Sequence, residues 1–231
     1  QMAAMQGRMA VLDGTVSTMS EEILRLKRGK VQADRQLVQM QRRRTQADSA
    51  CSADINSSGS VEVGDLLTKS ILAGGKILLC GNGGSAADAQ HLVAEFLVRL
   101  THDVNREGIP AISLLQDSST FTAAINDFDP VNLFKRNLET LAKPEDVLLV
   151  LSTSGNSKNI VQVLKTAKKI NVKAVGFLGS EGGKCLNYCD LAFVVPSNKT
   201  ARIQEVHITV GHALIEYVET RLLEEGFLSL R

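Results

Sequence analysis

The chain changes character at about residue 61, where short apolar runs begin to alternate with segments of helical length. Five of the apolar runs are typical of strands buried on both faces, because almost every position in them is hydrophobic. Strands are predicted over 76–80, 111–115, 147–152, 173–179 and 191–196. Helices are predicted over 85–100, 132–142, 157–170 and 201–225.

This alternation predicts the α/β class. A strand, a helix and a second strand in succession favour a right-handed crossover, a parallel sheet and helices on both of its faces. We therefore expect a three-layer αβα sandwich with a five-stranded parallel sheet. Ligands of such sheets bind at the carboxyl ends of the strands, so the loops after the first and third strands are expected to hold the chemistry.

Residues 1–60 lack this regularity and are rich in Gln, Arg, Met and Ser. Only 16–40 shows a partial helical spacing of apolar residues, and Gly29 interrupts it. The three arginines at 42–44 have no aromatic neighbours, which favours a solvated helix face over a nucleic-acid patch. We predict an N-terminal helical arm over 1–60, which serves in oligomerisation, and one domain over 61–231.

Charge and composition exclude several classes of partner. Lys and Arg number 26 and Asp and Glu 25, so a net charge of +1 gives no field that would attract nucleic acid or a membrane surface. No apolar stretch approaches the length of a membrane span, and no secretory signal is expected. The four cysteines lack paired spacing, which suits reduced thiols in the cytoplasm.

Two unusual loops follow the first and third predicted strands. The glycines of 81–85 allow a ligand to approach the backbone at a helix N-terminus, where free N–H groups attract an anion. The loop 152–157 carries four hydroxyls and no lysine, which suits a phosphate monoester better than a nucleoside triphosphate. Either loop alone could simply form turns and caps. Gly81-x-Gly83-x-x-Ala86 also fits a dinucleotide fingerprint with Asp117 as ribose ligand, but this alternative leaves the second loop unexplained.

Two helices carry candidate chemistry beyond these loops. His91 and Glu95 are four residues apart and share one face of a largely apolar helix. They could be an acid–base pair, two metal ligands or a structural pair. On the last helix, Gln204 and His212 lie along one side and can point into one cleft. His207 falls well round that helix and is expected to be a packing or surface residue.

Five motifs occur in order over 75–222. They are Cys80-Gly81-Asn82-Gly83-Gly84-Ser85, His91-x-x-x-Glu95, Asn126-Asp127-Phe128, Ser152-Thr153-Ser154-Gly155-Asn156-Ser157, and Ala201-Arg202-Ile203-Gln204-Glu205-x-His207 continuing to His212. As an ordered set they resemble the phosphoheptose isomerase family of the sugar isomerase (SIS) fold. The resemblance implies an intramolecular oxidoreductase that converts sedoheptulose 7-phosphate to D-glycero-D-manno-heptose 7-phosphate through an enediolate.

The resemblance also implies individual roles. Glu95 and His212 would carry the proton transfers. One zinc ion per site would be bound by His91, Glu95, Gln204 and His212. The substrate would be bound by Asn82, Gly83, Ser85, Arg99, Asp127, Ser152, Thr153, Ser154, Ser157 and Gln204. A homotetramer is implied, with each cleft completed by a neighbouring subunit, and the product would feed lipopolysaccharide or other surface-glycan synthesis.

Two other functions within the same fold are considered. Non-catalytic SIS proteins that bind the replication initiator keep the loops but lose the acid–base residues, whereas Glu95 and His212 are both present here. SIS domains that act on hexosamine or arabinose phosphates usually lack the His-Glu and Gln-His arrangement. One departure from the family pattern is Ala201, where some members carry an acidic residue.

Overall fold

The computed structural model describes residues 57–115 and 117–230. The predicted helix over 16–40 and the three arginines lie outside the described residues. The last four positions of the predicted arm open a helix, α2 (Ser57–Leu72), which continues into the domain. The division of the chain at residue 60 stays a prediction.

The centre of the domain is one sheet of five parallel strands in the order β2-β1-β3-β4-β5. The strands are β1 (Ile77–Gly81), β2 (Ala111–Ser113), β3 (Val147–Ser152), β4 (Lys173–Gly179) and β5 (Leu191–Val195). All five predicted strands are therefore present, and β3 and β4 have the predicted ends. Every position of β1 and β3 is buried, as the continuous apolar runs indicated.

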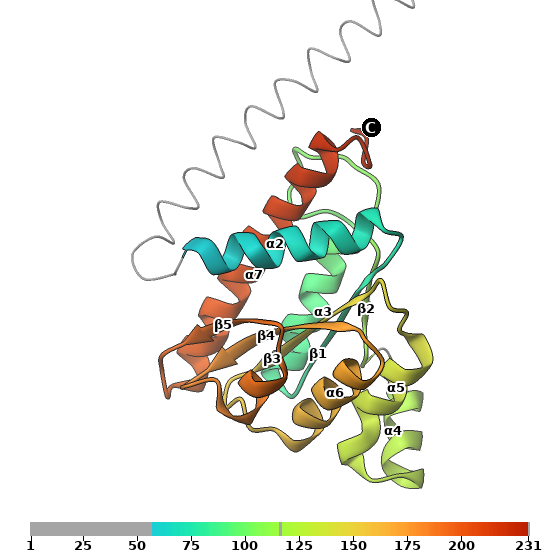
Figure 1. Ribbon diagram of the computed structural model, residues 1–231, viewed down its shortest axis with the longest axis vertical. Helices are drawn as coiled ribbons and strands as arrows, with labels where there is room; N and C mark the ends of the chain where they lie inside the picture. Colours follow the sequence, from blue (N-terminus) through green and yellow to red (C-terminus); the bar gives the residue numbers. More distant parts are fainter. Residues whose placement is uncertain (1–56, 116, 231) are drawn as a thin grey trace, which may run out of the picture. The chain divides into compact units, whose positions relative to one another are not determined.

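Helices cover both faces of this sheet, which confirms the predicted three-layer sandwich (Figure 1). Leu149 and Leu151 of β3 pack with α2, α3 (Gly84–Leu97) and α7 (Thr200–Glu224) on one face. Leu148 and Val150 point to the other face, where they pack with α5 (Leu133–Leu141), α6 (Lys158–Lys169) and the 3-10 segment η2 (Gly183–Tyr188). Successive side chains of β3 thus pack into two hydrophobic cores, one on each face of the sheet.

A further helix, α4 (Ser118–Asp127), was not predicted and buries none of its side chains. Its N-cap is Asp117, whose carboxylate accepts hydrogen bonds from the backbone N and the hydroxyl of Thr120 at 2.7 and 2.8 Å. These hydrogen bonds lower the pKa of Asp117. Asp117 is therefore a helix cap, and the dinucleotide alternative loses its ribose ligand. A short 3-10 segment, η1 (Pro130–Asn132), connects α4 to α5.

Three described cysteines, Cys80, Cys185 and Cys189, carry free thiols. Burial raises the pKa of Cys185 to about 11 and of Cys189 to about 12, and it raises the pKa of Cys80 further. These thiols stay protonated at neutral pH and act as small apolar side chains. Among the described residues, no helix is both long and apolar enough to cross a membrane.

The strand order places a topological switch between β1 and β3. In the strand order, β2 is the neighbour of β1 toward one edge of the sheet, and β3 is its neighbour toward the other edge. In an open parallel sheet the crevice at such a switch, at the carboxyl ends of the strands, is the usual ligand site. The two unusual loops follow these two strands.

Candidate active site

The glycine loop and the serine loop lie side by side at the carboxyl edge of the sheet. Gly81, at the end of β1, pairs in register with Leu151 of β3. The side-chain amides of Asn82 and Asn159 then exchange two hydrogen bonds, at 2.9 and 2.8 Å. The first loop is thus linked directly to the first turn of α6, and both helix N-termini face the same edge.

The serine loop is held in shape by its own backbone and by the segment around η2. Gly155 has a φ of 60°, and a Cβ there would collide with the carbonyl of Gly182, so only glycine fits. The Asn156 amide donates to the Ser154 carbonyl at 2.8 Å, and its oxygen accepts from the backbone N of Lys184 at 3.1 Å. The loop is therefore preorganised before any ligand binds.

The hydroxyls of the two loops differ in exposure. Ser85 and Ser152 are buried, Thr153 and Ser157 are half-buried, and Ser154 is exposed. The Ser152 hydroxyl oxygen is buried and has no hydrogen-bond partner among the described residues. Buried polar atoms are nearly always paired, so an unpaired hydroxyl at this edge suits a ligand oxygen.

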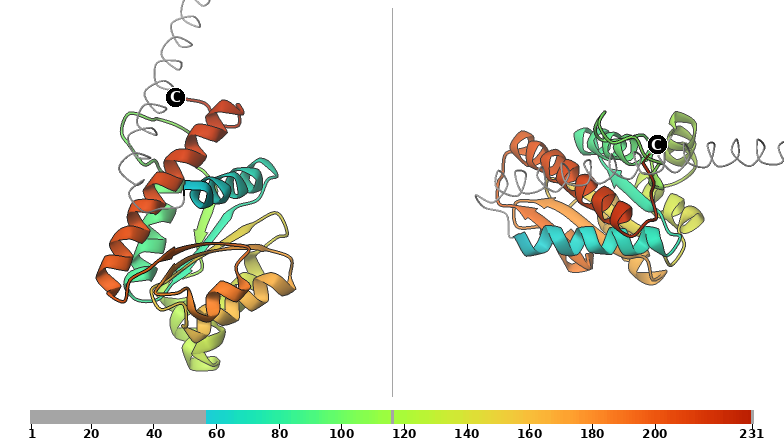
Figure 2. Two further views of the ribbon diagram at one scale, coloured as in Figure 1. Left: turned by 60° about the vertical axis from the view of Figure 1, so that its left-hand side comes forward. Right: turned by 90° about the horizontal axis from the view of Figure 1, so that it is seen from above.

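Two imidazoles from distant parts of the chain meet about two turns along α3 from the glycine loop. Nε2 of His91 on α3 lies 2.8 Å from Nε2 of His212 on α7, and the rings meet edge to face. The helices lie side by side (Figure 2) because Gly211 has no side chain and the space is filled by Leu92 of α3. The close helix contact brings together two residues separated by 121 positions.

Glu95 belongs to the same cluster. Its Oε1 lies 3.8 Å from Nδ1 of His91, on the opposite side of that ring from His212. Burial lowers the pKa of His212, and the charge of His91 lowers it further, while the charge of Glu95 opposes both. His212 is therefore mainly neutral at neutral pH. The predicted acid–base residues Glu95 and His212 are therefore close enough for the charge of one to affect the pKa of the other.

Asp88 is a polar neighbour that the sequence analysis did not single out. It lies one turn before His91 on α3, and burial raises its pKa while the charge of His91 opposes this. Its Oδ2 is buried without a hydrogen-bond partner among the described residues. The spacing of three residues between a carboxylate and a histidine was the available signal.

Gln204 joins the last helix to the glycine loop. Its side-chain amide lies against Gly84, where a Cβ would collide with Nε2. His207 is fully buried, and its Nε2 lies 3.2 Å from the carbonyl of Leu178. Of the two roles expected for His207, packing is the one that the structure shows.

Arg99 and Asp127 make no recorded contact with this cluster among the described residues of the single chain. Arg99 is half-buried just beyond the end of α3, and Asp127 is exposed at the end of α4, where it accepts a hydrogen bond from Asn126. Within the described residues, no hydrogen bond or ion pair joins either of them to Glu95 or to the histidine pair. Their predicted contact with the substrate stays a prediction.

The donors of the predicted zinc site fit zinc in their chemical type, because two imidazole nitrogens, a carboxylate and an amide oxygen are all ligands that this ion accepts. The facing Nε2 atoms of His91 and His212 are the best observation in favour. Glu95 approaches the other nitrogen of His91, and the described residues contain no group of three His, Cys, Asp or Glu side chains arranged to hold a metal. Zinc binding stays a prediction.

Comparison with known proteins decides the family. Residues 52–179 match the SIS domain family. The phosphoheptose isomerase of Clostridium acetobutylicum is 45% identical over 161 residues, which cover 70% of this chain and 81% of that protein. This chain belongs to the phosphoheptose isomerase family of SIS-domain proteins.

Solved structures of this family have the same fold. The phosphoheptose isomerase from Francisella tularensis superposes with a TM-score of 0.68 at 30% identity, over 75% of this chain and 91% of that one. The enzyme from Neisseria gonorrhoeae gives a TM-score of 0.66 at 32% identity, over 80% and 98% of the two chains. The predicted resemblance, the SIS fold and the expectation of a sugar-phosphate isomerase enzyme are confirmed.

Proposed function

We propose that this family member converts sedoheptulose 7-phosphate to D-glycero-D-manno-heptose 7-phosphate. The observation that carries the proposal is the meeting of His91, Glu95 and His212, from two helices, one of which begins at the glycine loop. The names of the relatives support a heptose phosphate as the substrate. The retained acid–base residues favour catalysis over a role as a regulator that binds the replication initiator.

The phosphate of the substrate binds at the carboxyl edge of the sheet. The hydroxyls proposed to bind it are those of Ser85, Ser152, Thr153, Ser154 and Ser157, together with Asn82 and the backbone of Gly83. The unpaired hydroxyl of Ser152 supports this assignment, because a phosphate oxygen would give it a partner. The N-termini of α3 and α6 add favourable dipoles for an anion.

The reaction needs one group to remove a proton and one to return it. The Glu95 carboxylate takes the proton from the carbon beside the carbonyl, which leaves an enediolate. His212 in its protonated form, the minor form at neutral pH, returns a proton to the neighbouring carbon, and the lowered pKa makes that form the stronger acid. Glu95 then releases its proton to solvent and His212 takes one up, so both groups return to their starting states. Gln204 holds the substrate from the side of the glycine loop.

Zinc is the proposed cofactor, held by His91, Glu95, Gln204 and His212. When bound, such an ion polarises the carbonyl and stabilises the charge of the enediolate. Metal analysis of the purified protein, with turnover measured before and after chelation, tests this part. Stoichiometric zinc and a loss of turnover that zinc restores are expected, whereas full activity of the metal-free protein would refute it.

The assembly is proposed to be a cytoplasmic homotetramer whose product feeds lipopolysaccharide or other surface-glycan synthesis. Phe121 and Ile125 of α4, and Phe128 just after it, are exposed in the single chain, which supports a contact with another subunit. Such a contact would also allow Asp127 to reach a neighbouring site. Sedimentation as a monomer at working concentration would contradict the tetramer.

The direct test is turnover of sedoheptulose 7-phosphate by the purified protein, compared with arabinose 5-phosphate and fructose 6-phosphate. The heptose phosphate is expected to be the best substrate, and Glu95→Gln is expected to abolish turnover while phosphate binding is retained. Glu139→Gln, which changes an exposed carboxylate on α5, is the matched control. Absence of turnover in the wild type, together with binding to the replication initiator, would favour the regulator instead.

A further inference from the structure

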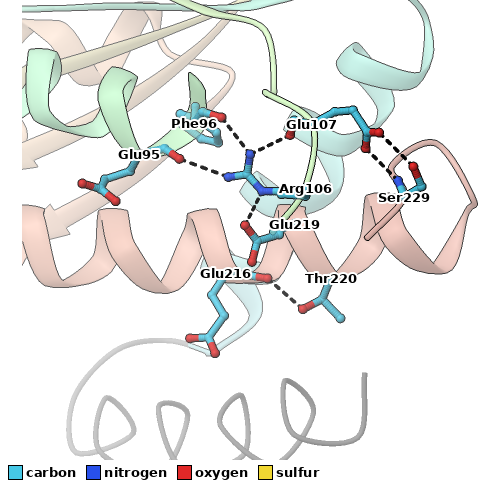
Figure 3. A network of polar contacts seen from close by, with 8 residues as sticks. All are labelled: Glu95, Phe96, Arg106, Glu107, Glu216, Glu219, Thr220 and Ser229. Atoms are coloured by element: carbon cyan, nitrogen blue, oxygen red, sulfur yellow. Dashed lines mark hydrogen bonds and ion pairs between the residues drawn. The ribbon is translucent and has the colours of Figure 1, made fainter. Parts of the chain in front are cut away.

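A buried arginine, Arg106, from the segment between α3 and β2 binds the C-terminal end of α3 (Figure 3). Its side chain is fully buried. Nη2 donates to the carbonyl of Glu95 at 3.0 Å, and Nη1 donates to the carbonyls of Phe96 and Glu107 at 3.0 and 2.9 Å. Nε donates to the carboxylate of Glu219 on α7.

These contacts tie the last turn of α3 to the C-terminal part of α7. The last carbonyls of a helix have no partner within the helix. Arg106 supplies one for Glu95 and one of two for Phe96, whose carbonyl also accepts from the backbone N of Ile109 at 2.9 Å. Through Glu219 the same guanidinium is anchored on α7. The planar fork of an arginine allows one side chain to make all these contacts at fixed angles.

The two helices joined in this way carry the proposed acid–base residues. Glu95 is itself one of the residues whose carbonyl Arg106 holds, so its Cα is fixed directly. Glu219 follows His212 by seven residues on α7, about 10 Å along the helix axis. The position of Glu95 relative to His212 is therefore set by the bond between Arg106 and Glu219 together with the packing of Leu92 against Gly211.

A buried ion pair is an inefficient way to stabilise a fold, because desolvation offsets much of its attraction. Burial raises the pKa of Glu219, and the charge and the hydrogen bond of Arg106 oppose the rise. The chain shields the pair further, since Ser229 donates to the Glu107 carboxylate at 2.9 and 2.8 Å and Leu228 is buried. This arrangement favours a geometric role for the pair.

We propose that Arg106 is a positioning residue of the isomerase, which sets the Glu95 carboxylate relative to His212 by clamping the end of α3 to α7. The inference rests on the proposed function. Arg106 touches the backbone of Glu95 and not the substrate, so its effect falls on the rate of proton transfer. Binding of the phosphate, at the opposite end of α3, is left intact.

The test compares Arg106→Lys with the wild type at 25 °C. Lysine keeps the charge but is a point donor and cannot hold both helical carbonyls and Glu219. In the folded variant, kcat is expected to fall at least tenfold while KM stays within about threefold, a split that follows from losing an interaction needed only in the transition state. Ser229→Ala is the matched control, because it loosens the chain end without touching the α3 carbonyls, and its kcat should be unchanged.

A second variant keeps the inference testable should Arg106→Lys not fold. Glu219→Gln keeps an acceptor for Nε but removes the countercharge, and its kcat is expected to fall at least threefold at unchanged KM. A crystal structure of either variant gives a readout without turnover, in which the Glu95 carboxylate is expected to be displaced relative to His212. An inactive wild type would refute the proposed function. Unchanged kcat and an undisplaced Glu95 in folded variants would refute the role of Arg106.

Discussion

Replacing Gly84 by alanine should separate catalysis from stability. Gly84 is the first residue of α3, where alanine is the better helix former by up to about 1 kcal/mol. The added Cβ would collide with Nε2 of Gln204, which is the end of a flexible side chain. Relief of the collision requires the amide to retreat by about 1 Å to reach ordinary van der Waals contact.

The expected result is a protein of unchanged or slightly higher melting temperature with impaired turnover. A displacement of about 1 Å in a positioned catalytic group can cost about 100-fold in rate, which corresponds to about 2.7 kcal/mol of transition-state stabilisation. We expect a loss of between about 10-fold and 100-fold in kcat/KM for sedoheptulose 7-phosphate, because Gln204 moves but stays in the site. Calorimetry and a steady-state assay of one preparation measure both quantities.

Gly74→Ala is the matched control. Gly74 lies in the turn between α2 and β1 with a φ of 82°, and a Cβ there would meet no atom within 4 Å. Alanine should therefore destabilise the protein by about 1–2 kcal/mol through backbone strain, without changing kcat/KM at 25 °C. Wild-type kcat/KM in folded Gly84→Ala would refute the reasoning, because Gln204 would then have no part in turnover.

Two further predictions concern buried polar groups. Ser152→Ala should leave stability unchanged or raise it by up to about 1 kcal/mol, because an unpaired buried hydroxyl is removed. The KM for the sugar phosphate should rise at least tenfold, and the increase in melting temperature caused by inorganic phosphate should become smaller. An unchanged KM would contradict the assignment of Ser152 to phosphate binding. Burial lowers the pKa of His207 in the folded state, so the unfolded chain binds the proton more readily. Stability should therefore fall as pH decreases below about 6.5. Thermal melts from pH 8 to 5 measure how steeply the stability falls with pH. His207→Leu should make this fall less steep, whereas His102→Gln, at an exposed position, should leave it unchanged. An equal fall in the wild type and in both variants would contradict the role of His207.

Most of the fold could be predicted because the strands are buried on both faces and stand out as apolar runs. Helix α2 was missed although Val63, Leu67 and Ile71 follow a helical spacing and are buried. Gly64 weakens the local helical signal, and it is glycine because the ring of Tyr217 occupies the place of a side chain. A tertiary contact thus overrides a local preference, which a single-sequence pattern does not reveal.

In the candidate site, too, local spacing predicted the contacts within one helix but not the contacts between distant segments. The shared face of His91 and Glu95 followed from their spacing on one helix, and the structure brings the two side chains within 3.8 Å. The meeting of His91 with His212 depends on Leu92 packing against Gly211, so it was reached through the family resemblance and not through spacing. Arg106 and Glu219 are 113 residues apart and leave no local signal at all.

Proton transfer between carbon and solvent tests the central claim most directly. Sedoheptulose 7-phosphate is incubated in D2O with the wild type, with Glu95→Gln and with Glu139→Gln, and deuterium at the two reacting carbons is followed by NMR. The account predicts aldose formation with deuterium incorporation by the wild type and by Glu139→Gln, and neither by Glu95→Gln, although that variant still binds inorganic phosphate. Isomerisation and exchange by Glu95→Gln at the wild-type rate would contradict the account.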